Sequence, residues 1–261
     1  MSEQTSGYLT VGPTRIYGTL YPSIFPVQWC LVLAEPFGEE KKCSSRMLVR
    51  MAEFLSKKHS CAVFKFDFSG TGDSSGKHSE ATWQQWQQEL AAAIAFIRKT
   101  SAAPKTALLG LRAGALIAAQ AAITEPIDQL ILASPLLSGA ELLKELQRRQ
   151  KIKEMLSGKQ TDAPSSENDF GGIVLNEILQ NELKDLSLLS FLSRLPARCA
   201  THLIHTTGAR SFPPAWKSLL TLLQKDSRSQ QILLHDKPFW GQLEYYESDL
   251  IQETIQRILY A

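Results

Sequence analysis

The feature that most constrains this chain is a run of small residues that directly follows a short apolar stretch. Residues 106–109 (TALL) lead into Gly110-Leu111-Arg112-Ala113-Gly114, and mostly small residues continue to Ala122. The apolar run predicts a buried strand, and the alanine-rich stretch predicts a helix. Because glycines flank the junction, the spacing indicates a sharp strand–turn–helix unit with Arg112 at its centre.

Segments with strand and helix character alternate on both sides of this unit. Strands are expected at a hairpin over residues 8–21 that turns at Gly12-Pro13, and at residues 28–34, 61–68, 105–109, 128–133, 201–206 and 230–235. Helices are expected at residues 44–59, 81–98, 113–122, 216–223 and 249–260. This alternation predicts an α/β fold with a mostly parallel central sheet and helices on both faces.

The alternation stops between residues 138 and 198. This stretch is helical and charged at first, rich in Ser, Asp, Pro and Gly around residues 159–172, and helical again afterwards. An insertion at the carboxyl ends of parallel strands lies over the crevice where such sheets bind ligands. We therefore expect a single domain over residues 1–261, with a helical lid at about residues 138–198 that is most mobile at residues 159–172.

The first helix of this lid carries basic residues that could bind an acidic partner. They are Arg148, Arg149, Lys151 and Lys153. Acidic residues are interspersed among them, at Glu141, Glu145 and Glu154. Mixed charge of this kind favours a solvated helix over a binding surface.

Composition and charge exclude several classes of function. The 261 residues carry a formal net charge of +2, so neither nucleic acid nor an anionic membrane is an expected partner. No apolar run approaches the length of a transmembrane helix, and the polar residues 1–10 predict no signal peptide. The cysteines, Cys30, Cys43, Cys61 and Cys199, are scattered, so neither a metal site nor a disulfide framework is predicted. A cytoplasmic protein with free thiols and no cofactor is the expectation.

Three stretches, in this order along the chain, resemble the α/β-hydrolase superfamily. Residues 35–40 (EPFGEE) follow an early strand, where the superfamily places its oxyanion loop. Residues 67–76 (DFSGTGDSSG) are similar to its D-x-x-G-x-G-x-S motif. Residues 110–114 (GLRAG) stand where it has G-x-S-x-G, with the nucleophilic serine at the centre of a tight turn called the elbow. The resemblance spans nearly the whole chain and implies the α/β-hydrolase fold.

A narrower resemblance rests on the same motifs together with Pro238-Phe239-Trp240 near the C-terminus. In combination they look like the second hydrolase-like family of the bacterial exosortase A system. That family is associated with exopolysaccharide and protein-sorting loci, and an arginine at the elbow is typical of it. The resemblance implies a protein partner encoded in such an export or sorting locus.

The catalytic groups of a serine hydrolase are missing from their expected positions. A serine nucleophile needs a histidine base that a carboxylate orients. The guanidinium of Arg112 stays protonated and has no lone pair to offer. Residues 208–214, where the superfamily has its acid, contain no Asp or Glu, and Pro238 stands where its histidine precedes an aromatic pair. We therefore predict no catalytic residues and a hydrolase-fold protein that has lost serine-hydrolase chemistry.

Two alternatives stay open at this point. A genuine hydrolase or acyltransferase could use relocated groups, and a scaffolding protein of an export locus would need none. Candidate substitute groups are Ser69, Ser74, Ser134, Cys43 and His235, but none has an evident base or partner in the sequence. His202 and His205 lie three apart on one expected strand and so face opposite sides, which makes them a poor metal pair.

Arg112 should have a negative partner. It precedes a helix N-terminus, where a cation is disfavoured by ~0.3–1 kcal/mol and an anion is favoured. An internal partner would be Glu39 or Glu40 in the facing loop, and an external one would be a small anionic ligand such as a carboxylate, phosphate or sugar acid. The residues predicted to bind such a ligand are Phe37, Glu39, Glu40, Arg112 and Ala113.

Overall fold

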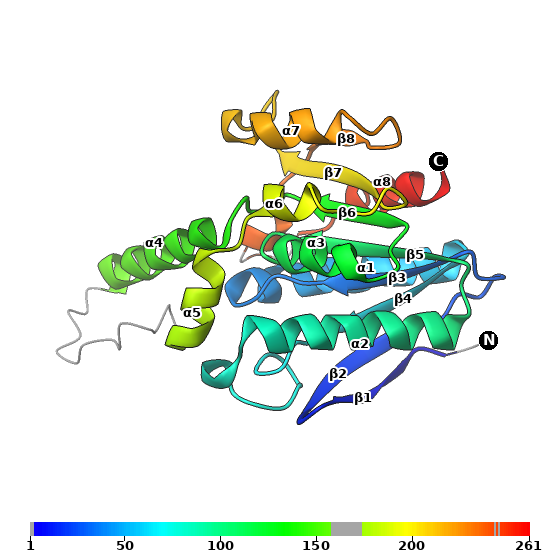
Figure 1. The fold of residues 1–261 in the computed structure, drawn as a ribbon, viewed down its shortest axis with the longest axis horizontal. Coiled ribbons are helices and arrows are strands. Elements are labelled where there is room, and N and C mark those ends of the chain that lie inside the picture. Colours follow the sequence, from blue (N-terminus) through cyan, green and yellow to red (C-terminus); the bar gives the residue numbers. More distant parts are fainter. Residues whose placement is uncertain (1–2, 158–173, 243, 245) are drawn as a thin grey trace.

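A computed structural model describes residues 3–157, 174–242, 244 and 246–261 of the chain. Within these ranges the strands form one sheet, in the order β1-β2-β4-β3-β5-β6-β7-β8 (Figure 1). The strands are β1 (Thr5–Val11), β2 (Thr14–Tyr21), β3 (Trp29–Ala34), β4 (Cys61–Phe66), β5 (Lys105–Leu111), β6 (Gln129–Ala133), β7 (Ala200–Thr207) and β8 (Gln231–His235).

The sheet is parallel except at one edge. The β1–β2 hairpin, which turns at Gly12-Pro13 as predicted, pairs antiparallel with β4 through β2. All other neighbouring strands pair in parallel, from β4 through β3 and β5 to β8. Every residue of β3 is buried, which explains why its sequence is a continuous apolar run and not an alternating one.

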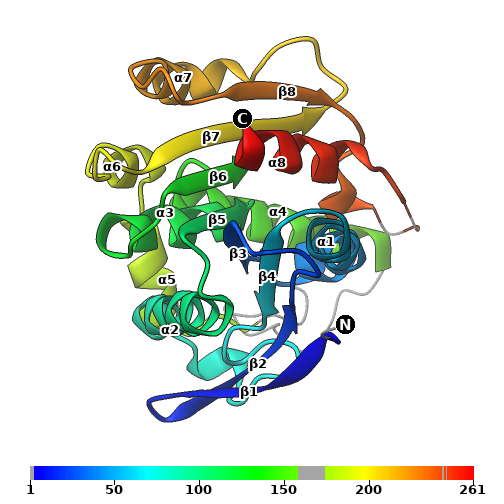
Figure 2. The same ribbon diagram turned by 90° about the vertical axis from the view of Figure 1, so that its right-hand side faces the viewer.

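Helices cover both faces of the sheet, as the alternation predicts. Two separate apolar cores result, one under α2, α3, α6 and α7 and the other under α1 and α8 (Figure 2). The α-helices are α1 (Glu39–Lys58), α2 (Trp83–Ser101), α3 (Gly114–Thr124), α4 (Gly139–Ser157), α5 (Glu177–Lys184), α6 (Leu188–Leu192), α7 (Lys217–Leu223) and α8 (Leu250–Tyr260). None of the helices among the described residues has the length and apolarity needed to cross a bilayer.

Two element boundaries differ from the prediction in ways that matter for the site. Helix α1 begins at Glu39 and not near residue 44, so Glu39 and Glu40 belong to its first turn and not to a loop. The periodicity of apolar residues starts later than the helix because its first turn is made of charged residues. Strand β5 continues to Leu111, so the turn is shorter than the glycine spacing suggested.

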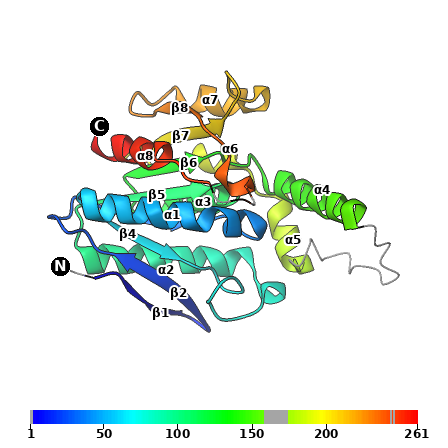
Figure 3. The same ribbon diagram turned by 180° about the vertical axis from the view of Figure 1, so that it is seen from behind.

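The segment between β6 and β7 holds α4, α5 and α6. Helix α4 extends away from the rest of the protein beside α5 (Figure 3). Its first half is anchored by Leu142, Leu143 and Leu146, which are buried, whereas Met155 near its end is exposed. Residues 159–172, where the sequence predicts the most mobile part of a lid, lie outside the described residues.

The turn between β5 and α3 is possible only because two glycines allow backbones to touch. A Cβ atom on Gly110 would lie 2.5 Å from the Cα of Ala115, and one on Gly114 would lie 2.0 Å from the carbonyl oxygen of Ala34 in β3. Both distances are far inside van der Waals contact. The glycines at both ends of the turn are therefore required by packing against the neighbouring strand and helix.

We expect Gly114→Ala to destabilise the protein by at least about 1–3 kcal/mol, because the added methyl group would collide with rigid backbone. Chemical denaturation gives the free energy of unfolding. The control is Gly208→Ala, where an added Cβ has no atom within 4 Å. Equal stability of the two variants would show that β3 and α3 are not packed as closely as described.

Candidate functional site

Arg112 occupies the centre of the strand–turn–helix unit, at the carboxyl edge of the sheet. Its φ of 55° lies in the left-handed region, which non-glycine residues rarely adopt. The backbone N–H of Arg112 donates to the carbonyl of Ala133 at 3.0 Å, which ties the turn to the end of β6. The turn thus keeps the strained backbone typical of a nucleophile elbow, although an arginine stands at its centre.

The guanidinium of Arg112 is buried and is held by three acceptors from three parts of the chain. Nε donates to Oε1 of Glu40 at 3.1 Å, and one terminal nitrogen donates to Oε2 of Glu145 at 2.6 Å. The other terminal nitrogen donates to the carbonyl of Ser134 at 3.2 Å. Only 12% of the Arg112 side chain is exposed, so these contacts are largely shielded from water. Each of the three guanidinium nitrogens of Arg112 therefore donates one hydrogen bond inside the protein.

Glu40 also binds a second arginine. Arg149 of α4 donates to the same Oε1 atom at 2.6 Å. Glu40, Arg112, Glu145 and Arg149 together form what we call the elbow ion cluster, with two positive and two negative charges. Burial by itself would lower the pKa of Arg112, but Glu40 and Glu145 outweigh burial and raise that pKa. The cluster connects the first turn of α1, the elbow and α4.

The expected pairing of Arg112 with Glu39 or Glu40 is confirmed for Glu40. Glu39 is exposed and lines a different pocket. Phe37 is buried, and its ring centroid lies 5.3 Å from that of Trp86. Ala113 is buried as well.

Glu145 and Arg149 were missed because α4 was interpreted as a solvated helix. That interpretation is wrong for these two residues, which face the elbow while exposed Lys144 and Arg148 face solvent. The signal in the sequence was their separation of four, which puts them on one side of a helix. It did not indicate which partner that side would meet.

The other two positions of a catalytic triad contain no catalytic side chain. Residues 208–214 follow β7 and carry no carboxylate. Pro238 precedes the short 3₁₀ helix of Phe239–Gly241, and Trp240 of that helix lies under Arg112, with 5.7 Å from the guanidinium carbon to the ring centroid. His235 is exposed at the end of β8. The cation at the elbow thus lies over an aromatic ring, and Pro238 occupies the position of the histidine.

Ser134 has a histidine neighbour that the sequence did not reveal. Its Oγ lies 3.4 Å from Nδ1 of His205, whose ring packs 4.5 Å from that of Trp216. Burial, and then the charge of Arg112, lower the pKa of His205, which favours the neutral ring. Ser134 is 1% exposed, and its Oγ accepts the N–H of Thr206 at 3.1 Å. The pair has the composition of a nucleophile and a base, but the hydroxyl is sealed from solvent.

The remaining candidate nucleophiles have structural roles or unfavourable surroundings. Ser74 donates to the carbonyl of Asp67 and accepts the N–H of Tyr17, so it holds the glycine-rich loop to β2. Burial, and then Glu39, raise the pKa of the Cys43 thiol, which disfavours a reactive thiolate. No group of three or more His, Cys, Asp or Glu side chains among the described residues is placed to hold a metal ion.

Comparison with known protein families identifies the family whose sequence pattern this chain matches. The family described as "Serine aminopeptidase, S33" matches residues 38–201, which run from the residue before α1 into the start of β7. The chain belongs to this family. The match includes the elbow and the whole insertion between β6 and β7, so the S33 family framework extends through the elbow ion cluster. Comparison with the curated proteins finds no match.

Solved structures show the same fold over nearly the full length of this S33 family member. Est1E from Butyrivibrio proteoclasticus has a TM-score of 0.67 at 16% identity and covers 98% of this chain and 97% of its own. The alpha/beta hydrolase domain-containing protein 10 from mouse has a TM-score of 0.60 at 18% identity and covers 98% of both chains. A Pyrococcus furiosus esterase has a TM-score of 0.67 at 13% identity, with 99% and 91% covered. The predicted α/β-hydrolase fold is confirmed.

We expect Glu40→Gln to lower the free energy of unfolding by about 1–3 kcal/mol, because it removes the buried carboxylate that Arg112 and the partly exposed Arg149 share. The matched control is Glu39→Gln, the same change one residue earlier at an exposed position, which should stay within about 0.5 kcal/mol of the wild type. Chemical denaturation at neutral pH measures both variants. Equal effects would mean that the elbow ion cluster does not contribute to stability.

Proposed function

We propose that this S33 family member does not hydrolyse esters or peptides at the elbow, and that it binds an anionic group there instead. The main support for this proposal is that Arg112 stands at the position of the nucleophile. Its guanidinium donates hydrogen bonds to Glu40, Glu145 and the Ser134 carbonyl. A guanidinium cannot attack a carbonyl, but it binds carboxylate and phosphate groups well.

In this proposal Arg112 has two alternative sets of partners. In the state described, carboxylates of the protein itself occupy the guanidinium. Because Glu145 and Arg149 both belong to α4, movement of that helix would release a donor of Arg112 and free Arg149 from Glu40 at the same time. A ligand carboxylate or phosphate would then take the place of Glu145 on the guanidinium of Arg112.

The same proposal treats residues 138–198 as a lid on a single domain over residues 1–261. Support comes from the position of α4, which follows the carboxyl end of β6 and forms one ion pair with Arg112 of the elbow and another with Glu40 of α1. The proposed ligand-binding residues are Arg112 and Glu40, with Phe37, Ala113 and Glu39 forming the adjacent wall. Opening of α4 is the step that would expose Arg112 and Glu40, whereas Glu39 is exposed already.

We place the protein in a bacterial export or protein-sorting system of the exosortase type, as a binding component that acts on a small anion or on a protein partner. The support is the combination of EPFGEE, the glycine-rich loop, GLRAGA and Pro238-Phe239-Trp240. All four cysteines are unpaired, which supports a reducing compartment such as the cytoplasm.

A hydrolase with relocated groups is the second candidate. The observation that favours it is the Ser134–His205 pair, together with the hydrolase activity implied by the family description. For this pair to act, the Ser134 hydroxyl would have to become exposed and exchange its bond to Thr206. The two candidates make different predictions for the same substitutions.

Purified protein should hydrolyse p-nitrophenyl acetate and butyrate no faster than buffer alone or denatured protein does, because no accessible nucleophile has a base beside it. Arg112→Ala and Ser134→Ala should leave that background rate unchanged. Turnover that Arg112→Ala abolishes would contradict the proposed function. Turnover that Ser134→Ala abolishes, and Arg112→Ala does not, would establish the second candidate.

A further inference from the structure

The outer edge of strand β1 is an exposed surface that is not part of the elbow site. β1 ends the sheet on one side, and among the described residues it pairs with β2 alone. Figure 2 shows it as the outermost strand at that end of the molecule. Of its seven residues, all but Leu9 and Val11 are exposed. The strand therefore presents its backbone as well as its side chains to solvent.

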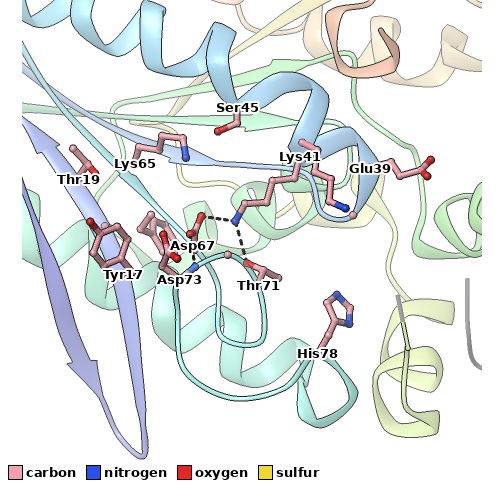
Figure 4. A pocket seen from close by; sticks show the side chains of 15 residues that line it. Tyr17, Thr19, Glu39, Lys41, Ser45, Lys65, Asp67, Thr71, Asp73 and His78 are labelled. Atoms are coloured by element: carbon pink, nitrogen blue, oxygen red, sulfur yellow. Dashed lines mark hydrogen bonds and ion pairs between the residues drawn. The ribbon is translucent and has the colours of Figure 1, made fainter. Parts of the chain in front are cut away.

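The other side of the hairpin is occupied by the glycine-rich loop. The N–H of Arg15 in β2 donates to Oγ of Ser75 at 2.7 Å, and its carbonyl accepts the N–H of Ser75 at 2.9 Å. The N–H of Tyr17 likewise donates to Oγ of Ser74 at 2.7 Å, and its carbonyl accepts the N–H of Asp67 at 2.9 Å. Figure 4 shows Tyr17 beside Asp67. Arg15 and Tyr17 thus turn their backbone groups away from β1.

This arrangement fixes which backbone groups of β1 face outward. The residues of β1 that lie opposite Arg15 and Tyr17 are Thr10 and Tyr8. In an antiparallel ladder, two opposite residues that do not bond to each other direct their N–H and carbonyl groups to opposite sides, and such pairs alternate along the strand. The backbone groups of Ser6, Tyr8 and Thr10 consequently point out of the edge of the sheet.

β1 lacks the features that protect the edges of natural sheets from pairing with another strand. Such edges are short or covered, or they carry lysine, proline or a bulge. Residues 5–11 (TSGYLTV) contain no charged residue and no proline, and they pair with β2 without a bulge. Strand β8 at the opposite edge has five residues, and only its last, His235, is exposed. β1 is therefore the edge that is open to a further strand.

The sequence of β1 is complementary to a second copy of itself. Two β1 strands that pair antiparallel about a two-fold axis at Tyr8 bring Ser6 opposite Thr10, Tyr8 opposite Tyr8 and Thr10 opposite Ser6. All three pairs consist of residues whose backbone groups point outward, so each pair exchanges two hydrogen bonds. A register displaced by two residues leaves only two such pairs within the strand. Aromatic pairs and Ser–Thr pairs stabilise sheets when they lie directly opposite, and no like charges meet in this register.

The ring of Tyr8 is already held in place for such a contact. Its hydroxyl donates to the carbonyl of Asp73 at 3.1 Å, and its ring lies edge-on to Tyr17 at 5.3 Å between centroids. The guanidinium carbon of Arg15 lies 5.1 Å from the ring centroid of Tyr8. Tyr8 nevertheless stays 56% exposed. An ordered side chain loses little conformational entropy when a partner covers it, which favours association.

We propose that β1 is an interface between two copies of this chain, in which the two strands pair antiparallel about a two-fold axis at Tyr8 and join the two sheets into one. A symmetric interface requires a patch that is complementary to itself, and the uncharged strand meets this requirement. A charged peptide would find no charged side chain in residues 5–11 to pair with. One pair of strands is small for an interface, so we expect a dimer that forms at micromolar concentrations of the protein.

Sedimentation equilibrium of the full-length protein tests the proposal. Between about 1 and 500 µM, the apparent mass should rise from that of one chain toward twice that mass. Over the same range, amide exchange at Ser6, Tyr8 and Thr10 of ¹⁵N-labelled protein should slow, because these N–H groups become hydrogen-bonded in the dimer. A protein that stays monomeric at the highest concentration, or one that dimerises while these three amides exchange as fast as before, would overturn the proposal.

A charge placed at the two-fold axis gives a sharper test. Tyr8→Lys and Tyr8→Glu should each raise the Kd of the dimer at least about tenfold, because like charges then meet directly across the strands. An equimolar mixture of the two variants should form a mixed dimer, since opposite charges meet there, and its formation would show that both variants are folded. The matched control is Phe25→Lys, at an exposed aromatic residue outside β1, which should leave the Kd unchanged.

Two results with these variants would contradict the proposed interface. One is a mixture of Tyr8→Lys and Tyr8→Glu that remains monomeric, and the other is an equal effect of Tyr8→Lys and Phe25→Lys on the Kd. Arg112→Ala should leave the Kd of the dimer unchanged, so the outcome is independent of the function proposed for the elbow.

Discussion

A buried guanidinium at the elbow is the interaction on which the rest of this site depends. An unpaired charge removed from water costs several kcal/mol, far more than the modest penalty of placing a cation before a helix. Arg112 can therefore occupy the nucleophile position only if the protein supplies acceptors. Glu40, Glu145 and the Ser134 carbonyl are those acceptors, and each comes from a different part of the chain. The side chain of Arg112 thus links the first turn of α1 and the helix α4 to the elbow.

This arrangement shows how the α/β-hydrolase framework accommodates Arg112 at the elbow. The close approach of Gly114 to β3, the left-handed backbone of Arg112 and the short turn into α3 are the features that aim a side chain into the crevice. They do not depend on what that side chain is. In the function we propose, the framework that presents a nucleophile to a carbonyl in a hydrolase presents a guanidinium to an anion here. The ring of Trp240 contributes as well, since an aromatic face favours a cation close to it.

The fold and half of the elbow ion cluster could be predicted from the sequence because both rest on local patterns. Gly110 and Gly114, the apolar runs and their alternation with amphipathic segments indicate the parallel sheet and the elbow directly. Glu40 was among the predicted partners because it follows β3, the neighbour of β5. Glu145 and Arg149 could not be found in this way, since their contact with Arg112 depends on the direction in which α4 leaves β6. Likewise, Ser134 and His205 meet only because β6 and β7 pair with Ala133 opposite Ile204, a register that no pattern in the sequence specifies.

The central claim is that Arg112 and Glu145 hold α4 against the elbow through a direct, partly buried ion pair. A double-mutant cycle with Arg112→Met, Glu145→Gln and the combined variant tests this most directly, with free energies of unfolding measured by chemical denaturation at neutral pH. The account predicts that the combined variant loses less stability than the sum of the two single changes, with a coupling energy of about 1–3 kcal/mol. Additive losses, with a coupling energy near zero, would show that the two residues do not interact and would contradict the account.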